Sequence, residues 1–361
     1  MSTAAVPTEG DSARGARRAE PGCPAEPGHM DIELAPEATE FGESALRSLG
    51  AAGGDELVRA AELDPYCRHA LVSPVLNRVG AWELDPRHDP LELEAAAALC
   101  RACGYWATPY PVAERLARPG RAGVAAAPEA EADGLVVVTG PRPEAALAGL
   151  ESRFAAVTPA GGRGLVRLTA SARGAVLASG RGAAFVLPVR FRPVGAPGAR
   201  DESVDADLAL VLTLQCWTLL GMLDRAVRLA REHVLVREQF GRPLAQFQAV
   251  QFQLTDAEVE RKGVDMLARY ALWSLGSGGA DALADALALR LAALDAADIV
   301  FRVAHQLHGA LGFCDESPLS WLSRHSLPLR RLPVAGGATE EWLARRVGTR
   351  GLTGLFSEGP P

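Results

Sequence analysis

The sequence is poor in several features that mark particular classes of protein. Lys262 is the single lysine in 361 residues, and the 44 acids outnumber the 37 basic residues, which gives a formal charge of -7. Because nucleic-acid binding depends on Lys and Arg that neutralise phosphates, no nucleic-acid partner is expected. With 48% hydrophobic and 22% charged residues, the composition is typical of a soluble globular protein with a large core.

Cysteine pairs and long apolar runs are also scarce. Only Cys100 and Cys103 among the six cysteines are close together, and no second CxxC or histidine pair accompanies them. We therefore expect two small helix residues there and no metal site, in a reduced, cytoplasmic protein. The most apolar segment, Leu208 to Leu223, is interrupted by polar residues, so it predicts a buried core helix and no membrane span. No signal peptide is predicted.

The first 29 residues are rich in Ala, Gly, Pro, Arg and Glu and have almost no apolar anchors. Such a composition cannot bury enough surface to offset the entropy lost on ordering, so disorder is predicted for residues 1–29. A folded beginning is expected at Met30, which is also a candidate start codon. Pro36 and Glu37 soon afterwards are typical of the first turn of a helix.

The remaining chain divides by composition into three segments. Apolar residues at helical spacing predict an N-terminal helical domain over residues 30–118, ending in a short helix from Val112 to Leu116. Residues 119–202 become rich in Gly, Pro, Val and Arg, which predicts a reduced β domain, a short middle β-barrel. Three β-like runs bounded by Gly or Pro lie in it: 135–138, 165–169 and 183–191.

Residues 203–355 return to helical spacing and predict a C-terminal four-helix bundle. Its first helix is expected from about Val204 to Arg237 and its second after Pro243. A third is expected from Ala280 to His308 and a short fourth from Thr339 to Val347. The predicted fold is thus mainly α with a small β domain.

The most distinctive local sequence lies between the first two bundle helices. It reads VREQFGRPL at 236–244 and FQAVQ at 247–251, and Gly241 and Pro243 in it break the chain between two helices. The motif resembles the R-x-Q-F-G-R-P-[IL]-x-x-F-Q-x-[VI]-Q signature of acyl-CoA dehydrogenases. QLHGALGF at 306–313 and GGATE at 336–340 resemble that family's Q-x-H-G-G-x-G-[YF] and G-G-T-x-E segments. The resemblance covers about residues 30–120 and 203–352.

The resemblance implies a role in binding FAD. In that family FAD lies across a subunit interface: the flavin ring sits on the β domain of one protomer, and the neighbour contributes residues from these motifs. Arginine suits such a role because its planar guanidinium bonds phosphate bidentately. By resemblance, seven residues of this chain would hold the pyrophosphate and adenosine end of an FAD bound mostly by a partner: Arg237, Gln239, Phe240, Leu244, Gln306, Gly309 and Ala310.

The chain departs from the family where the flavin ring and the acyl thioester bind. The family's T-E-P-x-x-G-S and G-x-K-x-W-[IV]-[TS] segments are both missing, since no Trp occurs between Trp106 and Trp217 and the single lysine is Lys262. The resemblance therefore implies a β domain that folds but cannot hold a flavin ring.

The family's catalytic base is also missing. Removing a proton α to a thioester carbonyl requires a general base within hydrogen-bonding distance. In most of the family this base is a Glu just before the terminal motif, and that position falls here on Gly336 or Gly337. A minority position on the first bundle helix falls near Val211. No catalytic residue is assigned. Several acids and histidines lie near these positions in the sequence, and each has an ordinary structural role as the alternative interpretation: Asp205, Asp207, Asp315, Glu316, Glu340, His305 and His308.

The motifs that act on a neighbour's FAD are thus present, and those that act within the same chain are missing. This pattern predicts the non-catalytic partner in an α2β2 heterotetramer with a second acyl-CoA dehydrogenase chain that holds the acyl-CoA. It resembles actinobacterial acyl-CoA dehydrogenases of lipid or steroid catabolism, which act on bulky substrates such as steroid side-chain CoA thioesters. Electron-transfer flavoprotein is a candidate further partner. Two alternatives stay open: a homomeric flavoenzyme that oxidises a carrier-bound intermediate, and a structural homologue that binds no flavin.

Overall fold

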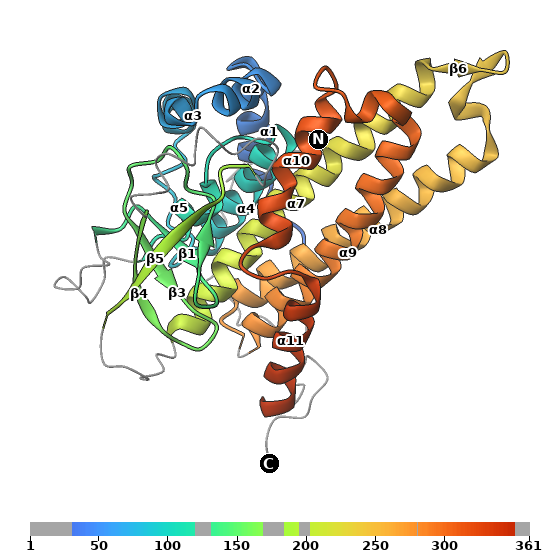
Figure 1. The fold of residues 1–361 in the computed structure, drawn as a ribbon. Coiled ribbons are helices and arrows are strands. Elements are labelled where there is room, and N and C mark those ends of the chain that lie inside the picture. Colours follow the sequence, from blue (N-terminus) through green and yellow to red (C-terminus); the bar gives the residue numbers. More distant parts are fainter. Residues whose placement is uncertain (1–30, 120–130, 169–183, 195–202, 280, 351–361) are drawn as a thin grey trace, which may run out of the picture. The chain divides into compact units, whose positions relative to one another are not determined.

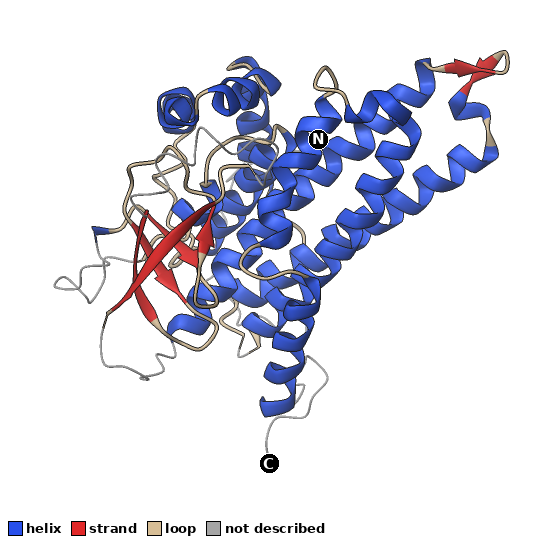
Figure 2. Cartoon of the chain, in the orientation of Figure 1, coloured by secondary structure: helices blue, strands red, loops and turns tan. Residues whose placement is uncertain are grey.

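The computed structural model describes residues 31–119, 131–168, 184–194, 203–279 and 281–350 (Figure 1), and residues from Ile32 onward form one compact unit. The predicted disorder of residues 1–29 and the candidate start at Met30 lie outside the described residues. The described chain is helix-rich with a small strand region (Figure 2), which confirms the predicted fold class. The three domain boundaries stay a prediction.

The N-terminal segment is helical, as predicted. Asp89 caps its longest core helix, because its side chain accepts hydrogen bonds from the backbone N–H groups of Leu91 and Glu92. Proline occupies the first turn of the opening helix. The elements are α1 (Pro36–Ala51), α2 (Asp55–Leu63), a 3-10 turn (Pro65–Cys67), α3 (Arg68–Arg78), α4 (Pro90–Tyr105) and α5 (Val112–Leu116).

The middle segment contains a five-stranded sheet in the order β1-β3-β4-β5-β2. β1 and β3 run parallel and are buried along their whole length, and the other neighbours are antiparallel. Within the described residues β1 and β2 end the sheet, so the predicted closure into a barrel is not seen there. β2 and β3 were not predicted. The strands are β1 (Gly134–Val137), β2 (Glu144–Ala145), β3 (Phe154–Val157), β4 (Arg163–Leu168) and β5 (Leu187–Pro193).

The C-terminal segment forms the helical bundle, with one helix more than predicted. The additional helix lies between the predicted third and fourth helices, and it contains Pro328 and several polar residues that obscured its spacing. It packs against the first and third bundle helices. The described helices are α7 (Ser203–Val236), α8 (Gln248–Gly276), α9 (Ala282–His308), α10 (Pro318–Arg331) and α11 (Gly336–Arg350).

Helix α7 is the axis of the bundle. It has 34 residues and is therefore about 50 Å long. By length and composition alone it could cross a membrane, but 89% of its most apolar window is buried inside the structure. Its place among α4, α8, α9 and α10 is that of a core helix, as the interrupted apolar run predicted.

Two glycines let α4 and α7 touch through their backbones. A Cβ on Gly104 of α4 would lie 1.8 Å from the carbonyl oxygen of Thr218, and a Cβ on Gly221 of α7 would lie 1.9 Å from that of Arg101. Neither position can accept any other residue without moving the helices apart. The N-terminal helices are therefore joined to the bundle at van der Waals distance of the main chains.

Buried Asp207 joins three segments of the chain. Its carboxylate, on the first turns of α7, pairs with Arg87 from the α3–α4 connection and Arg163 from β4, each at 2.5 Å. Arg87 also donates to the carbonyl oxygens of Ala117 and Arg118. An ion pair with this degree of burial fixes geometry more than it adds net stability.

Candidate functional site

The first cofactor motif forms a β-hairpin at the end of α7. β6 (Glu238–Gln239) pairs with β7 (Arg242–Pro243), and the loop between them has two residues, Phe240 and Gly241, with φ of 54° and 78°. Two successive positive φ angles are the signature of a type I′ hairpin turn, which normally requires Gly, Asn or Asp. The N–H of Leu244 donates to the carbonyl oxygen of Arg237 at 2.8 Å, which closes the base of the hairpin.

Phe240 is exposed and held in a strained conformation. Its side chain is 91% exposed, and a bulky residue with positive φ is a backbone outlier. Its ring contacts Phe247 edge to face, with centroids 6.2 Å apart, and Arg242 covers Phe247 at 4.1 Å. Strained residues of this kind are concentrated at binding sites, where the strain places a side chain for a ligand or partner.

The second motif lies at the same end of the bundle. His308, the last residue of α9, stacks on His233 in the last turn of α7, with ring centroids 4.5 Å apart. Gly309 follows with a φ of 60° and opens the 3-10 turn Gly309–Phe313. Burial lowers the pKa of both histidines, so they pack as neutral rings. His308 Nδ1 bonds the carbonyl oxygen of Ala304 at 2.8 Å, which gives this candidate base a helix-capping contact.

The structure therefore places the two predicted groups of cofactor residues at one end of the bundle. Six of the seven are exposed and one is partly buried, so their side chains and backbone are accessible to a molecule outside this chain. Their contact with FAD stays a prediction. They are Arg237, Gln239, Phe240, Gln306, Gly309 and Ala310, all exposed, and Leu244, partly buried.

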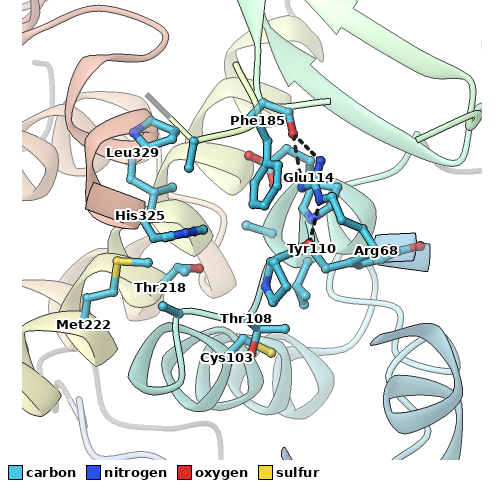
Figure 3. A pocket seen from close by; sticks show the side chains of 18 residues that line it. Arg68, Cys103, Thr108, Tyr110, Glu114, Phe185, Thr218, Met222, His325 and Leu329 are labelled. Atoms are coloured by element: carbon cyan, nitrogen blue, oxygen red, sulfur yellow. Dashed lines mark hydrogen bonds between the residues drawn. The ribbon is translucent and has the colours of Figure 1, made fainter. Parts of the chain in front are cut away.

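A second feature is a cavity inside the chain, where α3, α4, α5, α7, α10 and the segments beside β2 and β5 meet (Figure 3). Its volume is about 80 Å³, which is enough for several water molecules. Sites for cofactors and drug-sized ligands are several times larger, commonly about 300 Å³ or more. Sequence reasoning did not identify this cavity, because its wall comes from segments that are far apart along the chain.

Arg68 and Phe185 occupy the middle of this region (Figure 3). Arg68 is 2% exposed, and its Nε donates to the carbonyl oxygen of Pro109 at 2.8 Å. Its terminal nitrogens donate to the carbonyl oxygens of Ala146 and Ala148. The guanidinium carbon lies 3.9 Å from the centroid of the Phe185 ring. Burial lowers the pKa of Arg68 to about 9, and no ion pair compensates it within the described residues.

Glu114 is the one carboxyl group in the wall of the cavity. Its Oε1 accepts a hydrogen bond from Gln215 Nε2 at 2.8 Å, and burial raises its pKa. The opposite wall contains His325, whose Nε2 lies 2.7 Å from Glu62 Oε1; burial lowers the pKa of that imidazole. A buried carboxyl group with a raised pKa is the kind of group that serves as an acid or base.

The positions at which the sequence resemblance places the catalytic base are Gly336 or Gly337 and the vicinity of Val211, and the absence of a base stays a prediction. Gly336 and Gly337 begin α11, with open space around them, and Val211 is fully buried in α7. Three of the nearby acids form ion pairs, which gives them structural roles: Asp205 with Arg346, Asp207 with Arg87 and Arg163, and Asp315 with Arg324.

The cysteines form no metal site in the part of the chain that the structure describes. Cys100 and Cys103 are buried in α4 as free thiols, and burial raises the pKa of Cys103 to about 12. Among the described residues no group of three His, Cys, Asp or Glu side chains could hold a metal ion.

The fold and the exposed motifs define a class of flavoprotein oxidoreductases with a helical bundle at the C-terminus. Residues 213–351 match the family described as acyl-CoA dehydrogenase, C-terminal domain. Over this segment the chain belongs to the acyl-CoA dehydrogenase superfamily, which confirms the family resemblance seen there in the sequence.

Curated relatives match over part of their length. FadE27, an acyl-CoA dehydrogenase of Mycobacterium tuberculosis (strain ATCC 25618 / H37Rv), is 33% identical over 140 residues, covering 36% of this chain and 35% of the relative. A 3-sulfinopropanoyl-CoA desulfinase of Paraburkholderia xenovorans (strain LB400) is 32% identical over 132 residues, covering 36% and 32%. The matched part of this chain thus spans about a third of the length of these relatives.

The same fold occurs in a solved complex. A chain of the ChsE4-ChsE5 complex from Mycobacterium tuberculosis superposes with a TM-score of 0.69 at 17% identity, covering 88% of this chain and 99% of that chain. At this identity the likeness establishes the fold.

Proposed function

We propose that this chain is the non-catalytic subunit of a heteromeric, FAD-dependent acyl-CoA dehydrogenase. In this proposal it completes the FAD site of a second family chain, which holds the acyl-CoA and the catalytic carboxylate for α,β-dehydrogenation. A cytoplasmic α2β2 heterotetramer is the proposed assembly. The ChsE4-ChsE5 complex, named for two different chains, supports the heteromeric part of the proposal.

The observation that carries the proposal is a contrast between two surfaces of the same chain. At the end of the bundle, the predicted cofactor residues from two distant motifs are exposed together, and Phe240 is held there at a positive φ. Inside the chain, the cavity is about 80 Å³. The outer surface suits a ligand that another subunit holds, whereas the cavity beside Arg68 and Phe185 is too small for a flavin ring.

The residues of the outer surface fit the polar end of FAD. Arg237 makes no ion pair within the described residues and is exposed just beyond the end of α7, so its guanidinium is available for a phosphate. Gly309 has open space within 4 Å of its would-be Cβ, which lets a ligand approach the backbone. Bound FAD would supply the hydride acceptor; this chain would bind and orient its pyrophosphate end.

The test is to express this chain alone and together with an acyl-CoA dehydrogenase chain encoded beside it, and to measure flavin absorbance and mass. A colourless chain alone and one FAD per mixed pair is the expected result. Arg237→Ala in the pair should lower the FAD content, whereas Arg231→Ala, an exposed arginine one and a half turns earlier, should not. One FAD per chain in the isolated protein would refute the proposal.

A homomeric flavoenzyme with different chemistry is the second candidate. Two observations favour it: the wall of the cavity contains Glu114, a carboxyl group with a raised pKa, and one relative is named as a desulfinase. Glu114→Gln separates the two candidates. Loss of activity with retained assembly would indicate chemistry in this chain, and unchanged activity of the mixed pair would exclude it.

A further inference from the structure

The cavity between α4, the sheet and α10 is small because side chains of this chain fill the space around it. We infer that Phe185 and Arg68 act as an internal stopper, which keeps a flavin ring and an acyl chain out of this cavity. This inference deepens the proposed function, on which it rests for the presence of FAD at a shared site.

The position of Phe185 is enforced. Its φ of 63° places a bulky side chain in the left-handed region of the backbone, which costs free energy and persists only where the surroundings hold it. Three contacts do so. Its carbonyl oxygen accepts from the N–H of Ala148 at 3.0 Å, its ring lies under Arg68 at 3.9 Å, and the edge-to-face contact with His325 has centroids 5.4 Å apart.

Arg68 is held in place by hydrogen bonds to backbone carbonyl groups of two distant segments. Its hydrogen bonds reach Pro109 before α5 and Ala146 and Ala148 after β2, so one side chain joins the N-terminal helices to the sheet segment. Its donors point at carbonyl groups and its face covers an aromatic ring, which leaves no free edge for a phosphate or carboxylate ligand. Figure 3 shows Arg68 and Phe185 packed together beside the cavity.

On the side away from Arg68, the space that remains is lined by Met222 of α7 and by His325 and Leu329 of α10 (Figure 3). A volume of about 80 Å³ cannot admit a three-ring flavin or an acyl chain without removal of a side chain. At this place the stopper therefore puts protein atoms where a ligand would need space.

The first test is titration of the full wild-type chain with lumiflavin, which is the flavin ring without its ribityl phosphate, followed by fluorescence. No saturable binding is expected, and binding of one lumiflavin per chain would overturn the inference. The second test is xenon pressurisation of crystals. In Phe185→Gly, where glycine tolerates the positive φ, xenon is expected beside Arg68 at the place of the deleted ring, which protein atoms fill in the wild type.

The role of Phe185 is disproved if the variant takes up no xenon there or if the wild type already does. Phe185→Leu, which keeps an apolar side chain, replaces the glycine variant if that one does not fold, with partial xenon occupancy expected. Phe313→Ala, at the exposed end of the bundle, is the control and should admit none. FAD content of the mixed pair is a separate readout. A mixed pair without FAD would refute the proposed function but not the role of Phe185 and Arg68. Lumiflavin binding in the cavity would refute that role but not the shared FAD site.

Discussion

The guanidinium of Arg68 lies 3.9 Å from the ring centroid of Phe185, and both side chains are anchored by segments far apart along the chain. This contact lies where the N-terminal helices, the sheet and α10 meet. It connects the stability of the fold with the closure of the cavity, because the same atoms serve both.

Replacing Arg68 should destabilise the protein markedly. Arg68→Met would leave the carbonyl groups of Pro109, Ala146 and Ala148 buried without donors, which we expect to lower the free energy of unfolding by about 3 kcal/mol. Urea unfolding of the purified chain measures it. Arg47→Met, which removes an exposed pair with Glu43, should change it by less than about 0.5 kcal/mol. Similar losses for both variants would contradict the structural role of Arg68.

Replacing Asp207 tests the junction of the three segments. In Asp207→Asn the partly buried cations of Arg87 and Arg163 lose their buried counter-charge, and a loss of about 3 kcal/mol is expected. Thermal and urea denaturation provide the measurement. Asp298→Asn, in an exposed pair with Arg330, is the matched control, with a change within about 0.5 kcal/mol. An Asn variant as stable as the control would show that the two arginines find other partners.

Replacing Phe240 should separate stability from cofactor binding. Phe240→Gly removes an exposed ring and relieves a positive φ, so the unfolding free energy of the chain should rise by about 1 kcal/mol. The FAD content of the mixed pair should fall at the same time. Phe252→Ala, an exposed aromatic on α8, should leave FAD content unchanged. A clear loss of stability in Phe240→Gly would mean that its contact with Phe247 serves the fold.

The stacked histidines predict a dependence of stability on acid pH. Burial lowers the pKa values of His233, His305 and His308 from the ordinary 6.5, so the unfolded chain binds more protons than the folded one once the pH falls below about 6.5. Stability is complete above that pH and should decline as the pH falls through the lowered pKa values.

Unfolding midpoints at a series of pH values measure this decline. His308→Gln removes one of the buried imidazoles and should flatten the pH profile. His88→Gln, at an exposed histidine paired with Asp85, should keep it. A wild-type profile that is level between pH 7 and the acid limit of about 5 would contradict the expectation.

Local patterns predicted the helices and some of the strands. The short helix from Val112 to Leu116 was found at its predicted bounds, and the β-like run at 135–138 corresponds to β1. Both have a clear apolar pattern and a Pro or Gly at one end. α10 was missed because Pro328 and its charged residues give no clear spacing, although tertiary contacts with α7 and α9 hold it. β3 was missed because four residues are too few to show a period.

The site was predictable only where a motif is continuous in the sequence. The hairpin residues Arg237 to Leu244 follow one another, so the pattern itself identified them. The stopper could not be found in this way, because Arg68 begins a helix and Phe185 lies in the β-like run 183–191, just before β5. Nothing in the sequence indicates that they touch. Their contact is a product of the packing of distant segments.

The main-chain contact of α4 and α7 at Gly104 and Gly221 limits how this protein can change. Cys103 and Thr218, which line the cavity, lie beside those contacts. The wall that α4 and α7 contribute to the cavity therefore cannot move by a shift of these helices. Attempts to engineer a working ligand site into this cavity would have to change the opposite wall, which contains Phe185 and Leu329. Substitutions confined to the two crossing helices would meet rigid backbone, and variation there should be the least tolerated by the chain.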